Sequence, residues 1–145
     1  MGRKVFRYKI IGILIFLIEL FIFALFSYGS YDSFIEVDFN NIFLMQNFIF
    51  IFAVLVASTA LSNLIFILFS ARKSILFLNI HFSIIFLFFT YGFVKMLLEN
   101  GYYEEDNIKF IIAFSLIFIL LFVVNFFKYR KVEFSEIEEI GKYNN

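Results

Sequence analysis

The chain has 145 residues, of which 63% are hydrophobic and 23% aromatic, with a mean hydropathy of +0.94 and a formal net charge of zero. Soluble domains are typically about 45–50% apolar, so this composition excludes a water-soluble fold and indicates a membrane protein. The absence of cysteine excludes disulfides, thiolate metal sites and cysteine nucleophiles.

Apolar runs long enough to cross a bilayer occur at residues 10–28, 48–70, 75–98 and 108–127. A hydrocarbon core of about 30 Å needs roughly 20 helical residues, and backbone groups in lipid must be hydrogen-bonded within the helix. Continuous runs of this length do not fit the short alternating strands of a membrane barrel. We therefore predict an all-α, integral membrane four-helix transmembrane bundle that forms a single domain over residues 1–145. The first connection, residues 29–47, is the longest.

The cations are distributed unequally along the chain. Ten of the twelve Lys and Arg residues fall on one predicted side: Arg3, Lys4, Arg7, Lys9, Arg72, Lys73, Lys128, Arg130, Lys131 and Lys142. The other side has Lys95 and Lys109 beside most of the acids of the connections. The positive-inside rule therefore predicts that both termini are cytoplasmic, including a short acidic tail at 128–145. We predict a multi-pass protein of the bacterial cytoplasmic (inner) membrane. In overall plan the chain resembles small four-helix membrane proteins of several unrelated bacterial families.

Three polar side chains fall inside the predicted helices at similar depth. Glu19 lies nine residues from the inner edge of its helix, His81 six, and Asn63 seven on a helix that runs the opposite way. An ionisable side chain at the centre of a membrane helix costs about 2.5–3.5 kcal/mol or more. One interpretation is a Glu19–His81 pair, oriented by Asn63, that takes up or passes a proton, because histidine titrates near neutral pH. The alternative is a hydrogen-bonded cluster that only fixes helix packing.

The second predicted helix contains the small residues Ala53, Ala57, Ser58, Ala60 and Ser62. Small side chains about four residues apart allow the backbones of membrane helices to approach closely. We therefore predict that these residues form a helix-packing face and that this helix is central to the bundle.

The absence of recognisable catalytic or ligand-binding motifs narrows the classes of function. The sequence has no glycine-rich phosphate loop, no nucleophile motif and only one histidine. We expect no enzyme activity, catalytic residue, cofactor or metal, and no nucleic-acid partner. The favoured function is a non-catalytic subunit, anchor or regulator of a membrane assembly, whose partners are the lipid bilayer and either copies of itself or another membrane protein. The alternative is an oligomeric ion- or proton-conducting pore, or a membrane-acting defence effector or its immunity partner, with Glu19 and His81 in the path.

Overall fold

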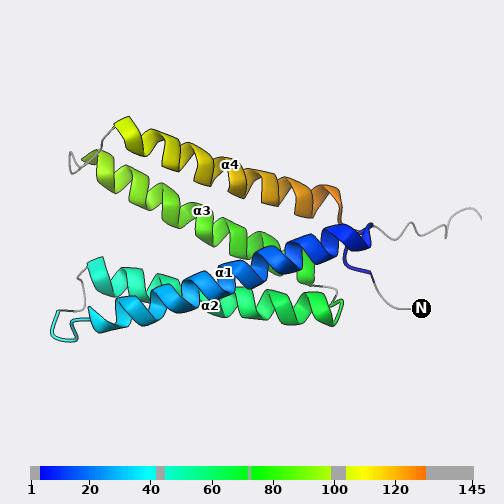
Figure 1. The fold of residues 1–145 in the computed structure, drawn as a ribbon, viewed down its shortest axis with the longest axis horizontal. Coiled ribbons are helices and arrows are strands. Elements are labelled where there is room, and N and C mark those ends of the chain that lie inside the picture. The colour runs from blue at the N-terminus through cyan, green and yellow to red at the C-terminus, as the bar shows by residue number, and fades with distance from the viewer. Residues whose placement is uncertain (1–3, 42–44, 72, 99–103, 130–145) are drawn as a thin grey trace, which may run out of the picture.

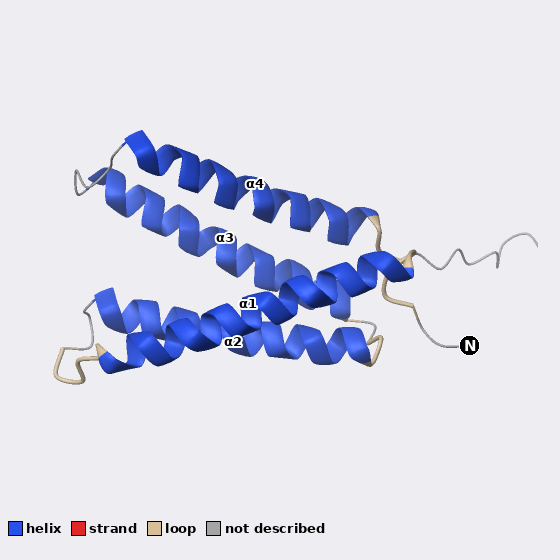
Figure 2. Ribbon diagram, in the orientation of Figure 1, coloured by secondary structure: helices blue, strands red, loops and turns tan. Residues whose placement is uncertain are grey.

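The computed structural model describes residues 4–41, 45–71, 73–98 and 104–129. It contains the helices α1 (Lys9–Ile35), α2 (Met45–Leu68), α3 (Ser74–Leu98) and α4 (Glu104–Phe126) (Figures 1 and 2). All four are long and apolar enough to cross a membrane. The prediction of an all-helical fold with four helices of membrane-spanning length and apolarity is therefore confirmed for the described residues. Arg72 and the tail from residue 130 onward lie outside the described residues.

Helix α1 continues past the predicted end at Tyr28 to Ile35 and takes up part of the predicted first connection. Its 27 residues correspond to about 40 Å at 1.5 Å per residue, which exceeds the ~30 Å of a hydrocarbon core. The helix is therefore longer than a straight crossing of that layer requires. Tyr28 and Tyr31, in the last turns of α1, are 72% and 69% exposed. Exposed tyrosines are typical of the ends of membrane helices.

The helices contact one another in chain order. The contact between α1 and α2 is the most extensive, and α3 contacts α2 on one side and α4 on the other. Helices α1 and α3 start at the same end of the bundle at which α2 and α4 terminate. We call it the basic end, because it carries the cations Lys4, Arg7, Lys9, Lys73 and Lys128. In Figure 1 the α1–α2 pair and the α3–α4 pair come together at the basic end and diverge toward the opposite end.

A short backbone bridge closes the basic end. The N–H of Arg7 donates to the carbonyl of Phe127 at 2.8 Å, and the N–H of Tyr129 donates to the carbonyl of Val5 at 2.9 Å. Between these bonds Phe6 is 5% exposed and packs into the apolar core. The segment before α1 is therefore attached to the segment after α4, although the two are at opposite ends of the sequence.

The turn between α2 and α3 is tight and strongly hydrogen-bonded. Ser70 adopts a left-handed backbone with φ of 48°, and the N–H of Ala71 donates to the carbonyl of Phe66 at 2.9 Å. This pattern is typical of a helix C-terminus. The buried Ser74 hydroxyl lies 2.9 Å from the same Phe66 carbonyl and 2.7 Å from that of Ala71. These contacts hold the start of α3 against the end of α2.

The apolar core lies between the helices and includes Phe6, Ile15, Val56, Leu78, Phe82, Ile85, Ile117 and Val124. Each helix contributes to it, and most other apolar side chains face outward. That distribution suits a membrane protein, because lipid tails are as apolar as the protein interior.

Candidate functional site

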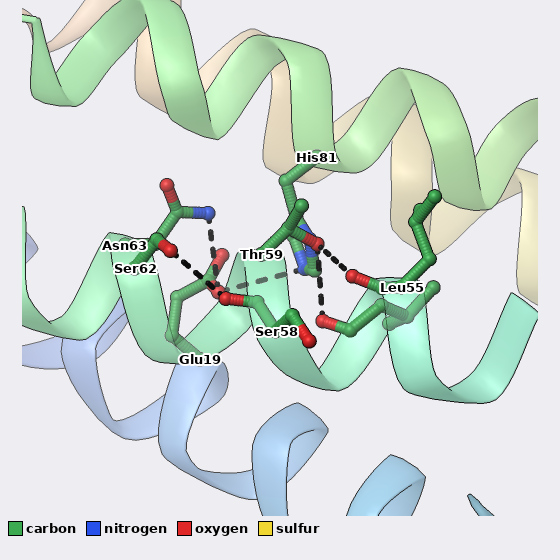
Figure 3. A network of polar contacts seen from close by, with 8 residues as sticks. Glu19, Leu55, Ser58, Thr59, Ser62, Asn63 and His81 are labelled. Carbon is green, nitrogen blue, oxygen red and sulfur yellow. Dashed lines mark hydrogen bonds and ion pairs between the residues drawn. The ribbon is translucent and has the colours of Figure 1, made fainter.

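A buried polar cluster lies where α1, α2 and α3 meet (Figure 3). The Nε2 of His81 is 3.5 Å from the Oε2 of Glu19, and both side chains are fully buried. The Nδ2 of Asn63 donates to the same Glu19 oxygen at 3.4 Å, and Asn63 is 1% exposed. The structure thus brings together all three residues of the predicted polar cluster.

Each polar residue belongs to the inward-facing stripe of its helix. On α1, Glu19 follows Ile15 by four residues, and these two are the buried residues of that helix. On α3, His81 lies among the buried Leu78 and Phe82. Residues three and four apart share one face of an α-helix. The helices that bury these apolar side chains therefore also bury the polar ones.

Thr59 completes the cluster and was not identified from the sequence. Its Oγ1 lies 2.8 Å from the Nδ1 of His81 and within hydrogen-bonding distance of the backbone carbonyls of Leu55, at 2.9 Å, and Val56, at 3.0 Å. A signal was present, because Thr59 precedes Asn63 by four residues and therefore shares its helical face.

The hydrogen-bond donors and acceptors of the site determine how many protons Glu19 and His81 must hold. The Thr59 hydroxyl has one hydrogen. If it donates to a helix carbonyl, its oxygen accepts from the Nδ1–H of His81. The Nε2 of a neutral imidazole then has no hydrogen and faces the Glu19 carboxyl group, so a stable contact requires one proton between them.

The other tautomer leads to the same requirement. If Thr59 donates to Nδ1, the Nε2–H of His81 faces Glu19, and an ionised carboxylate is then an uncompensated negative charge. An uncompensated buried charge of the kind left by removing one partner of an ion pair typically costs about 3–5 kcal/mol. In either tautomer the pair is neutral only when it holds one dissociable proton.

Three polar atoms of the cluster have no hydrogen-bond partner: the Oε1 of Glu19, the Oδ1 of Asn63 and the Nε2 of His81. The 3.5 Å separation of Glu19 and His81 is longer than an ordinary hydrogen bond. Buried polar atoms without partners are uncommon and often occur at functional sites. Within the described residues, the hydrogen-bonding capacity of the cluster is therefore incompletely satisfied.

The five small residues of α2 do not share one environment. Ala53 and Ala60 are buried, Ala57 and Ser62 are partly buried, and Ser58 is exposed. The Ser58 and Ser62 hydroxyls donate within α2, to the carbonyls of Val54 at 2.7 Å and Ser58 at 2.9 Å. Helix α2 contacts both α1 and α3, and Ala53 and Ala60 are the members of the set that its inner face buries.

A second polar contact joins α3 to α4. The amides of Asn79 and Asn125 exchange two hydrogen bonds, of 3.2 and 2.7 Å, near the basic end. Sequence reasoning assigned neither residue a role, because spacing within a helix does not identify partners on another helix.

Among the described residues, no three His, Asp or Glu side chains are grouped as a metal site requires. Comparisons with protein-family models, with curated proteins and with solved structures give no match for this chain. The chemistry of the buried cluster is therefore the basis for a functional conclusion.

Proposed function

We propose that this protein is a non-catalytic, multi-pass protein of the bacterial cytoplasmic membrane that regulates a membrane assembly through a proton held by Glu19 and His81. The observation that supports this proposal best is the buried contact of the two side chains across α1 and α3, at 3.5 Å. In this proposal, gain or loss of that proton changes how the α1–α2 pair packs against α3.

The position of the cluster links protonation to helix packing. Its members come from α1, α2 and α3, so loss of the proton leaves a negative charge where these helices meet. A charge at the centre of a membrane helix costs about 2.5–3.5 kcal/mol or more, and separating the helices or admitting water would reduce that cost. A partner membrane protein, or a second copy of this chain, would sense the change through the outer faces of the helices.

A second candidate function is proton conduction through the membrane, as a pore or a membrane-acting defence effector. It is favoured by an apolar groove of about 520 Å³ between α2 and α3 in the half of the bundle away from the basic end. Leu55 and Ile84 line the groove, and they lie one helical turn from Thr59 and His81 respectively. Widening at this groove would open a route from the opposite end to the polar cluster.

Glu19→Gln tests the proposal because it preserves size and removes the dissociable proton. The chain has no cysteine, so cysteines introduced at the exposed Leu25 and Leu87 can carry spin labels on α1 and α3. We expect the distance between the labels to change, in the otherwise unaltered protein, when the pH is raised far enough to remove the shared proton. Glu19→Gln and His81→Gln should each abolish that change in distance. The double variant should behave as either single variant does, because the two residues act together.

The matched control is Glu36→Gln, which removes an exposed carboxylate beyond the end of α1. It should leave the distance change intact. A pH-dependent distance that persists in Glu19→Gln would contradict the proposal. Proton flux into liposomes that exceeds that of protein-free liposomes, and that Glu19→Gln removes, would favour conduction over regulation.

A further inference from the structure

Two cavities flank the segment that precedes α1 at the basic end. The first, of about 570 Å³, lies between this segment, the start of α1 and the end of α2. The second, of about 850 Å³, lies between the same segment and the end of α4. Arg7 and Tyr8 border both cavities, so the two cavities share these residues as a common wall.

The first cavity combines apolar walls with cations at its edge. Phe6, Ile13, Phe16 and Leu68 are among its apolar lining residues, and the cations Lys4, Arg7 and Lys9 also border it. An apolar interior with positive charge at the rim matches a molecule that has an acyl chain and an anionic headgroup. A free anion would gain nothing from the apolar walls.

The second cavity adds groups suited to a phosphate. Lys128 borders it with Arg7, and the aromatic side chains of Tyr8, Phe126 and Tyr129 lie beside them. Arginine can bind phosphate oxygens with two parallel hydrogen bonds. Tyrosine rings favour the headgroup level of a membrane, where one edge is apolar and the other is hydrated.

The backbone bridge positions two of these cations, Arg7 and Lys128. The residues on either side of Phe6 and Lys128 are hydrogen-bonded across the bridge, and the Arg7 guanidinium lies 5.4 Å from the centre of the Tyr8 ring. Lys4, Arg7, Lys9 and Lys128 make no ion pair with a described carboxylate. We call these four residues the basic collar.

We propose that the basic collar binds one anionic phospholipid. Arg7 and Lys128 hold its phosphate, and an acyl chain occupies the 570 Å³ cavity beside Phe6 and Ile13. Basic pockets at the cytoplasmic ends of membrane helices are suited to anionic headgroups. The bound lipid would join the segment before α1 to the segment after α4, in addition to the backbone bridge.

Native mass spectrometry of the full chain in detergent tests the site, with phosphatidylglycerol as the probe and phosphatidylcholine of the same acyl chains as the neutral comparison. We expect one phosphatidylglycerol to be retained in preference to phosphatidylcholine. Arg7→Gln and Lys128→Gln should each weaken retention about fivefold, because a cation near an anionic headgroup contributes ~1 kcal/mol. Both variants keep the backbone groups of the bridge, and an unchanged melting temperature will show that the fold is intact.

Lys73→Gln is the matched control, because Lys73 is an exposed cation at the same end that borders neither cavity. It should retain phosphatidylglycerol as the unaltered protein does. If Arg7→Gln or Lys128→Gln lowers the melting temperature, the Lys4→Gln Lys9→Gln variant replaces it, because both side chains are exposed. Equal retention of the two lipids, an equal loss in Lys73→Gln, or full competition by inorganic phosphate at the same concentration would each overturn the proposal.

Discussion

The Oγ1 of Thr59 lies 2.8 Å from the Nδ1 of His81 and joins α2 to α3 at a fully buried imidazole ring. The Nε2 of the same ring faces Glu19 on α1. His81 is therefore hydrogen-bonded on one side only, and its two nitrogens face different helices. Thr59 fixes the ring orientation that directs Nε2 toward the carboxyl group.

Thr59→Val removes the hydroxyl while nearly preserving shape. We expect this change to lower the free energy of unfolding in mixed lipid–detergent micelles by about 1–3 kcal/mol, because the Nδ1 of His81 loses its partner in a buried site. Thr59→Ser retains the hydroxyl and should lose less. Equal stability of Thr59→Val and the unaltered protein would show that this contact does not contribute to the fold.

Ala60→Leu should destabilise the monomer by about 1–3 kcal/mol through overpacking, because Ala60 is fully buried where α2 meets its neighbours. Ser58→Leu is the comparison, since Ser58 is exposed on α2 and a larger side chain there has room within the monomer. Thermal unfolding of both variants in detergent measures the difference. A loss of oligomer with an unchanged monomer in Ser58→Leu would instead place that face against a second copy.

Asn79→Leu and Asn125→Leu should each destabilise the contact between α3 and α4, because each leaves one amide of a reciprocal pair without its partner. Interhelical hydrogen bonds in membranes average about 0.6 kcal/mol, with a maximum near 1.7. A double-mutant cycle on unfolding free energies should give a coupling in that range. Strictly additive effects would mean that the two amides act independently.

Lys73→Cys and Asn107→Cys test the predicted orientation of the helices. Both positions are exposed, and the chain has no cysteine of its own. Because the positive-inside rule places the basic end in the cytoplasm, a membrane-impermeant maleimide should label Asn107→Cys in intact spheroplasts and Lys73→Cys only in inverted vesicles. Labelling of Lys73→Cys from outside would reverse the orientation.

The sequence by itself determined that the chain forms four apolar helices of membrane-spanning length, because hydropathy and length are local properties. It also predicted that Glu19, Asn63 and His81 lie at a similar height along the bundle, because helical rise per residue is constant. It misplaced the end of α1, which continues to Ile35. Hydropathy marks where an apolar run ends, whereas a helix continues as long as its backbone hydrogen bonds are satisfied.

Only the tertiary structure decided which faces of these helices meet. In a soluble helix, polar side chains mark the outer face, but lipid and protein interior are equally apolar, so the membrane helices of this chain show no such contrast. For that reason Thr59, the Asn79–Asn125 pair and the bridge between Phe6 and Lys128 were found only in the structure. Each depends on contact between segments far apart in sequence, which local spacing does not specify.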